Sequence, residues 1–250
     1  MSAVTVIRNK TEQAILALFA KHKDQLQGQG SFGSQRAKAF ASFEQTGLPH
    51  RRIEAWHYTD LRSLLRDAPP LASKPASHVV QRAAEKNWST DQIDATRLML
   101  VNGFYDESIS TFTMPQGVKV TDVYKALSDP SSKRFHDHIG QATQSSDPLI
   151  ELNTAFMNGG VVIEIASGTK LDKPLELRCL VEGIDPVSIH ARILVIAGDD
   201  TEFTLIESHQ GPDALSYQVN NVVELFLGNN AQVHHCLLYT SPSPRDVEES

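Results

Sequence analysis

The sequence is poor in cysteine, in long apolar runs and in excess basic charge. Two cysteines in 250 residues, Cys179 and Cys236, are too few for a disulfide framework. No apolar run is long enough to span a bilayer, and the opening MSAVTVIRNK lacks the apolar core of a signal peptide. The net charge of −7 provides no basic surface for nucleic acid. These absences predict a cytoplasmic protein that binds neither membranes nor nucleic acids.

A phosphate-binding loop is also lacking. No G-x-x-x-x-G-K-[ST] pattern occurs, so the chain is not expected to be an ATPase. Residues 28–33 do match G-x-G-x-x-G, but the dinucleotide fingerprint requires a strand before the glycines and a helix after them. Because a helix is expected before this segment, we interpret it as a loop between two helices.

The second half of the chain contains a repeat of about thirty residues. Gly168, Gly198 and Gly228 stand at this spacing, and each closes an apolar run rich in β-branched residues. A second, alternating run follows each glycine, at 175–181, 202–207 and 233–239. Two short strands per repeat, with Gly, Asp and Asn at the corners, predict the coils of a parallel β-helix, in which each coil covers the apolar face of its neighbour.

The first run of each repeat alternates in character. The residues five and three before each glycine are always apolar: Ile163 and Ile165, Ile193 and Val195, Val223 and Leu225. The residues between them vary freely: Glu164, Leu194 and Glu224. Since side chains alternate faces along a strand, we expect the apolar set to stack inside the solenoid and the variable set to point outward.

The first part of the chain is predicted to be helical. Thr11 is expected to cap a helix that fades at Gly28, and a second helix is expected at about 34–45. We divide the chain into a helical region with a linker at 1–95, an entry segment with β-helix coils at 96–239, and a disordered or foreign tail at 240–250.

Residues 47–61 gather two arginines, two histidines and several aromatic and acidic residues. One interpretation is an acid/base or ligand-binding cluster. Nothing nearby supplies a nucleophile or a third metal ligand, which favours a structural role instead. We therefore expect Trp56 and Tyr58 to be wedged into the core, with Arg52 and Glu54 paired beside them.

Two other segments contain candidate metal ligands. His136 and His138 would need a third ligand, and we expect them to be solvated surface residues. If the repeat keeps its register, His235 aligns with Leu205 on the inner face, while His234 and Cys236 point outward together. An imidazole and a thiolate on one face could hold a soft divalent metal with ligands from elsewhere. The alternative is a polar residue beside a half-buried cysteine.

Several motifs, in order, resemble the SufB/SufD family of iron–sulfur cluster assembly proteins. The first comprises Gly47, Leu48 and Pro49, followed by Glu54, Trp56 and Tyr58. The others are Val101-Asn102-Gly103, the LNTAF segment containing Asn153, Asn158-Gly159-Gly160, Ala191-Arg192-Ile193-Leu194 and Leu205-Ile206-Glu207-Ser208. The resemblance covers about residues 10 to 239 and is closest to SufD.

The resemblance implies a mainly β fold, a right-handed parallel β-helix preceded by a helical region. It implies a scaffold that pairs with SufB and binds the ATPase SufC, with no enzymatic activity of its own. No cofactor is expected on this chain alone, although the complex handles iron or an iron–sulfur cluster. Family members continue with further coils and a helical domain that docks SufC, so we expect a truncated form that captures SufC poorly.

Two alternatives remain at this point. One is a secreted-type polysaccharide-active β-helix enzyme, which would require a secretion signal and an exterior groove lined by Asp or Lys. Neither feature is evident. The other is a metal-binding β-helix module built around His234 and Cys236.

Overall fold

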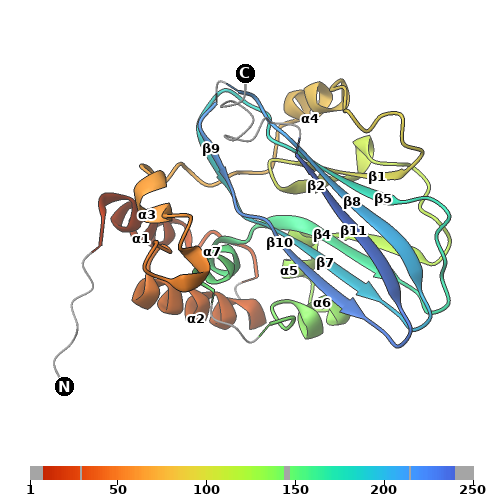
Figure 1. The fold of residues 1–250 in the computed structure, drawn as a ribbon, viewed down its shortest axis with the longest axis horizontal. Coiled ribbons are helices and arrows are strands. Elements are labelled where there is room, and N and C mark those ends of the chain that lie inside the picture. Colours follow the sequence, from red (N-terminus) through yellow and green to blue (C-terminus); the bar gives the residue numbers. More distant parts are fainter. Residues whose placement is uncertain (1–7, 29, 144–146, 214, 240–250) are drawn as a thin grey trace.

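The computed structural model describes residues 8–28, 30–143, 147–213 and 215–239 (Figure 1). The predicted tail at 240–250 lies outside them. The helices are α1 (Lys10–His22), α2 (Ser31–Thr46), η1 (Glu54–Trp56), α3 (Leu61–Leu64), α4 (Ser77–Ala84), η2 (Glu107–Ile109), α5 (Val123–Ser128), α6 (Lys133–His138) and α7 (Pro148–Phe156). None of the helices in these residues is long and apolar enough to cross a membrane.

The strands form one large sheet and one small one. They are β1 (Thr96–Val101), β2 (Phe104–Asp106), β3 (Val118–Asp122), β4 (Gly159–Ile165), β5 (Leu175–Leu180), β6 (Val187–Ile189), β7 (Ala191–Ala197), β8 (Glu202–Gln210), β9 (Tyr217–Val219), β10 (Val222–Leu227) and β11 (Gln232–Tyr239). The large sheet has the order β10-β7-β4-β2-β1-β5-β8-β11, and β6 pairs with β9. With several helices packed around the strands, the architecture is mixed rather than mainly β (Figure 1).

Most strand pairs are parallel and connect successive repeats. β4, β7 and β10 form one parallel stack, and β1, β5, β8 and β11 form another. The chain passes from the first stack to the second and then to β6 or β9 before it begins again. This order of pairing produces stacked coils, a β-helix-like arrangement. β3 and β2 add antiparallel pairs at the entry to the first coil.

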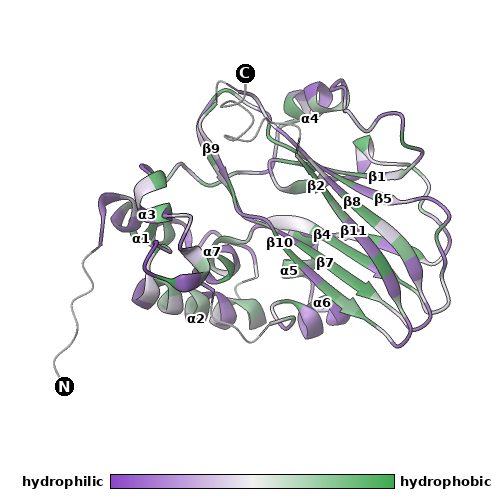
Figure 2. Cartoon of the chain, viewed as in Figure 1, coloured by the Kyte–Doolittle hydropathy of each residue, from purple (hydrophilic) through white to green (hydrophobic). Residues whose placement is uncertain are grey.

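The interior of the coils is built as the alternation predicts. Val161, Ile193 and Val223 are aligned across the three strands, and Ile163, Val195 and Leu225 form the next row. These side chains share one apolar cluster with Leu98, Leu100 and Leu205 from the second stack. The apolar character of β7 and β10 is visible in Figure 2.

The other face of the first stack is covered by protein, not by solvent. Val162, Leu194 and Ile196 pack against apolar residues of α5 and α6, which include Leu127 and Phe135. The variable positions therefore do point away from the coil interior, but Leu194 and Glu224 are buried beneath helices. Their variation reflects different helical neighbours in each coil and does not indicate free exposure.

The register corrects the predicted equivalence of the three glycines. Gly198 and Gly228 are equivalent, since their N–H groups donate to Ile165 O and Ala197 O on the preceding strands. Gly168 is not their counterpart. β4 and β7 pair with Ile165 opposite Ala197, which places Gly168 in register with Asp200 and, one coil later, with Asn230.

Backbone conformation gives the physical reason for that shift. Gly168, Asp200 and Asn230 all have positive φ, at 75°, 56° and 57°. Gly168 N donates to Asp199 O, and Asp200 N donates to Asn229 O in the same way one coil on. Asn and Asp adopt this left-handed conformation more readily than other non-glycine residues, so the corner does not require glycine.

The first helix begins two residues earlier than predicted and has a different cap. Asn9, not Thr11, caps α1, and it forms a capping box with Glu12. Glu12 is buried, accepts a hydrogen bond from Leu48 N at 2.9 Å and pairs with Arg62 at 3.1 Å. One carboxylate thus joins α1 to residues 47–49 and to the start of α3.

The expectation of an aromatic anchor at residues 47–61 is wrong. Leu48 is fully buried, but Trp56 is only half-buried and Tyr58 is 97% exposed. Leu61 N donates to Pro49 O at 3.0 Å, which closes the segment into a loop that is buried only at residues 47–49. Arg52 and Glu54 are both exposed, and the ion pair in this loop joins Arg51 to Asp60 at 3.4 Å.

A different tryptophan is the buried one. Trp88 is 5% exposed, and the guanidinium carbon of Arg178 lies 5.1 Å from its ring centroid. It packs with Met99, Val101 and Leu180 on the outer side of the second strand stack. Trp88 therefore has the anchoring role that the sequence suggested for Trp56.

The stability of the protein should fall as the pH is lowered from about 6.5 to about 4, because of His190. This imidazole is buried and stacked on Phe156, with the two ring centroids 5.1 Å apart, and burial lowers its pKa to about 4. Between these pH values the unfolded chain binds a proton at His190 that the folded chain does not bind. The resulting loss of folding stability is absent above about pH 6.5 and grows as the pH falls. Urea unfolding of the parent and His190→Gln across this range measures the effect. An equally steep loss in the variant would assign it to other groups.

Candidate functional site

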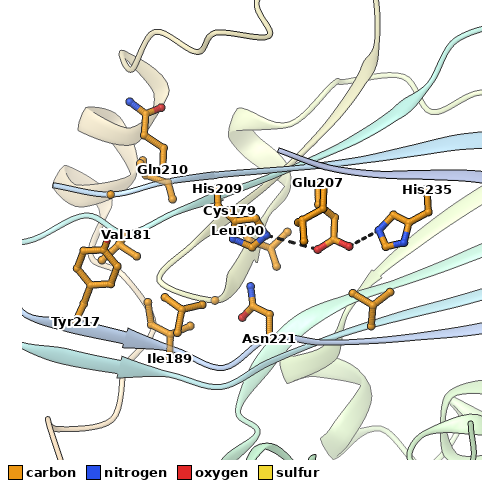
Figure 3. A pocket seen from close by; sticks show the side chains of 16 residues that line it. Leu100, Cys179, Val181, Ile189, Glu207, His209, Gln210, Tyr217, Asn221 and His235 are labelled. Atoms are coloured by element: carbon orange, nitrogen blue, oxygen red, sulfur yellow. Dashed lines mark hydrogen bonds and ion pairs between the residues drawn. The ribbon is translucent and has the colours of Figure 1, made fainter. Parts of the chain in front are cut away.

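The coil interior contains a cavity of about 470 Å³ toward its last two coils. Strands β5, β8 and β11 form one side of this cavity, and the segment from β9 to β10 forms the opposite side (Figure 3). Its walls are largely apolar and include Leu100, Val181, Ile189 and Val223. Concave, largely apolar sites with a few polar groups are the usual form of small-ligand sites in proteins.

The polar groups in this cavity centre on one carboxylate. Glu207 lies between two histidines, with His235 Nε2 at 2.5 Å from Oε1 and His209 Nε2 at 3.6 Å from Oε2 (Figure 3). The Glu207 side chain is 4% exposed. Burial opposes ionisation, but the hydrogen bonding and charge attraction of His209 and His235 together outweigh it, and the pKa of Glu207 is lowered. The site therefore presents an ionised carboxylate with two imidazoles.

Strand geometry explains how these three side chains meet. Glu207 and His209 are two apart on β8 and share the face of Phe203 and Leu205. His235 pairs with Leu205 in the parallel ladder between β8 and β11. The predicted register of His235 with Leu205 is confirmed. His235 thus lies diagonally across from Glu207, within reach of its carboxylate.

Two other groups adjoin this cluster. Cys179 pairs in register with His209, and burial together with the charge of Glu207 raises the pKa of its thiol. A protonated, buried thiol is a poor nucleophile. Asn221 lines the same cavity, and its Oδ1 atom is buried without a hydrogen-bond partner among the described residues.

The metal ligands suggested by the sequence are not brought together. His234 and Cys236 are both exposed on β11 and alternate with the inward His235. His136 and His138 are half-buried on α6, where they contact the carbonyl oxygens of Asp129 and Arg134. In the part of the chain that the structure describes, no three or more His, Cys, Asp and Glu side chains are arranged to hold a metal ion.

Asn153 and Asn102 link structural elements. Asn153 is fully buried on α7, where its Nδ2 donates to Ala191 O at 2.9 Å and to Asn220 O at 2.6 Å. Asn102 has a φ of 50° and exchanges hydrogen bonds with the backbone of Glu182. These contacts give both asparagines a packing role within the described structure.

Gly103 lies beside Asn102 in the turn between β1 and β2. It has a φ of 85°, and a Cβ atom there would lie 2.7 Å from Ile189 Cγ2. Glycine is therefore required both by the conformation and by the close approach of the next coil.

Glu207 and His209 were not singled out from the sequence. The signal was nevertheless present, since both residues continue the inward alternation of Phe203 and Leu205, where an apolar side chain is expected. Charged and polar residues at inward positions of a solenoid mark a buried polar site. The alternation predicts which face a side chain occupies, but it could not predict how close the side chains of β8 and β11 lie to one another.

The coils and the helical entry place this chain in the class of β-helix-like proteins with a helical N-terminal region. Residues 9–177 match the family profile described as the SufBD protein N-terminal region. The chain belongs to the SufBD family.

A curated relative carries a description of its role. It is an iron–sulfur cluster assembly SufBD family protein from Synechocystis sp., and the two sequences are 30% identical over 198 residues. The match covers 75% of this chain but 43% of that protein. The chain thus spans less than half the length of the relative.

Proposed function

We propose that this protein is a SufD-like scaffold component of the cytoplasmic machinery that assembles iron–sulfur clusters. It would work with a SufB-like β-helix protein and a SufC-like ATPase and have no enzymatic activity of its own. The observation that carries the proposal is the family match over residues 9–177, which includes the described helices and strand β4 and ends within β5. The description of the Synechocystis relative supports the same role.

The chemistry of the chain is compatible with a scaffold. The sequence has no P-loop, so ATP hydrolysis would come from a partner. Two cysteines, one buried with a raised thiol pKa and one exposed, do not furnish the four thiolates of a typical cluster. A cluster held by this chain would therefore need ligands from another subunit.

The last described coil supports association with another β-helix. No described strand pairs with the free edges of β10 and β11, and the inward-facing Leu237 is 45% exposed. Unpaired backbone groups beside apolar side chains favour addition of further strands. The right-handed parallel β-helix of a SufB-like partner would supply such strands.

Pairwise co-purification tests the proposal. The tagged chain is expressed with SufB or with SufC. In the control, an unrelated tagged parallel β-helix protein takes the place of the chain. We expect SufB to be retained well above the control, and SufC to be retained weakly. If a folded chain retained SufB no better than the control, the assignment to this machinery would be wrong.

A further inference from the structure

We propose that the interior cavity binds a small organic cation, a molecule with a short apolar body and a primary ammonium group that lies between Glu207 and Asn221. The apolar walls hold the body of the ligand, and the two side-chain acceptors receive its N–H groups. The inference concerns this chain alone and goes beyond the proposed function, which assigns no ligand to the coils.

The walls of the cavity suit an apolar body. Leu100, Val181 and Ile189 line it and are at most 5% exposed. Val219 and Leu237 also line it but are 42% and 45% exposed, so the cavity opens to solvent beside β9 and β11. Its volume of about 470 Å³ is within the range of roughly 300–1,000 Å³ that small-molecule sites occupy. A ligand can therefore enter at the last described coil and bury its apolar part against the inner walls.

The polar groups of the cavity are mainly hydrogen-bond acceptors. The two oxygens of Glu207 contact one imidazole nitrogen each, from His209 and His235, whereas a carboxylate can accept about four hydrogen bonds. Asn221 lies on the opposite side of the cavity from this carboxylate (Figure 3). Its Oδ1 is buried and has no hydrogen-bond partner among the described residues, and leaving a buried acceptor without a donor is costly. A ligand head group with several N–H donors supplies the missing donors.

The charges around the cavity favour a cation over an anion. Among the described residues that line it, Glu207 is the only carboxylate, and none is lysine or arginine. The imidazoles of His209 and His235 are both directed to this carboxylate. A hydrogen bond to an ionised group is stronger than one between neutral groups, and apolar walls strengthen the attraction further. The carboxylate of an anionic ligand would instead lie beside Glu207 without a lysine or arginine to pair with it.

The competing explanation is an unfilled coil interior. In that case Glu207 only holds β11 onto β8 through His235, and the strands of a partner cover the opening of the cavity. This explanation predicts either no binding or binding of any apolar molecule, whatever its head group. Selectivity for the head group, measured on the chain alone, therefore separates the two explanations.

The experiment compares three probes that share a hexyl body: hexylamine, 1-hexanol and hexanoate. Each is titrated into the full chain at about pH 7.5, where an alkylamine is protonated as lysine is. Ligand-observed NMR gives the affinities. We expect saturable binding of hexylamine, at least about tenfold tighter than that of 1-hexanol, because only the ammonium group makes charged hydrogen bonds. Hexanoate should not bind saturably.

Variants locate the binding in the cavity. In Glu207→Gln the preference for hexylamine over 1-hexanol should disappear, and Asn221→Ala should weaken hexylamine binding about fivefold. Glu202→Gln is the matched control, because Glu202 lies on the same strand but is exposed and paired with Lys170 at 3.3 Å. This control should bind as the parent does, and circular dichroism should show that the variants are folded.

Several results would overturn the site. They are no saturable binding of hexylamine by the parent, equal affinity for hexylamine and hexanoate, an unchanged preference in folded Glu207→Gln, and an equal loss in Glu202→Gln. If Glu207→Gln does not fold, unchanged affinity in Asn221→Ala overturns the site by itself. Co-purification with SufB is independent of this result: hexylamine binding without SufB capture contradicts only the scaffold role, and SufB capture without hexylamine binding contradicts only this site.

Discussion

Replacing Arg192 with alanine is expected to destabilise the protein by about 3–5 kcal/mol, the usual cost of leaving a buried charge without its partner. Arg192 is 1% exposed and its guanidinium makes three side-chain contacts: Asn153 Oδ1 at 2.9 Å, Thr154 Oγ1 at 2.7 Å and Glu224 Oε2 at 2.9 Å. Its loss would leave the buried Glu224 carboxylate without this cationic partner. Urea unfolding gives the change in free energy.

The matched control is Arg134→Ala. Arg134 pairs with Glu164 at 3.1 Å but is 56% exposed, and a change within about 0.5 kcal/mol is expected. In the double variant Arg192→Ala with Glu224→Gln, neutralising the stranded charge should recover part of the loss, which a double-mutant cycle measures. A loss below about 1 kcal/mol in Arg192→Ala would show that water reaches this network.

The Arg192 network joins α7 and the segment after α6 to the coils. Arg192 belongs to β7, Asn153 and Thr154 to α7, and Glu224 to β10. Glu224 also accepts hydrogen bonds from Gly140 N and Ala142 N, beyond α6. Two coils and the covering helices therefore share one buried polar cluster, whose members are distant in sequence.

The repeat could be predicted because coil stacking imposes a local rule on the sequence. Inward positions such as Ile163, Val195 and Leu225 must be apolar in every coil, and this alternation is visible without a structure. The outward face follows no such rule, since its neighbours are helices that pack differently on each coil. The burial of Leu194 and Glu224 was for this reason not predictable from periodicity.

Only part of the candidate site could be predicted from the sequence. The register placed His235 inside, because one parallel ladder fixes the face of every residue in the strand. Glu207 and His209 become meaningful only when the distances between strands are known. The predicted burial of Trp56 was wrong for a different reason. An aromatic residue in a motif suggests burial, but the Pro49–Leu61 hydrogen bond turns the segment outward.

The corner glycines supply the other large expected effect. Gly198→Ala should destabilise the protein by about 3 kcal/mol, in the range of overpacked cores. A Cβ atom at Gly198 would lie 2.7 Å from Ser167 N and 2.9 Å from Ser167 Cα, and a backbone neighbour cannot rotate away. The two coils would have to separate at this corner, which weakens the ladder between β4 and β7.

Gly168→Asn is the matched variant, since it alters the glycine that directly follows Ser167, the residue in contact with Gly198. Nothing lies within 4 Å of a Cβ at Gly168, and Asp200 and Asn230 adopt its left-handed conformation in the following coils. The substitution should therefore change stability by less than about 1 kcal/mol. Urea midpoints of the two variants measure the contrast. Equal losses would mean that the two glycines are equivalent corners after all, and that the two-residue shift between the first and second coils is wrong.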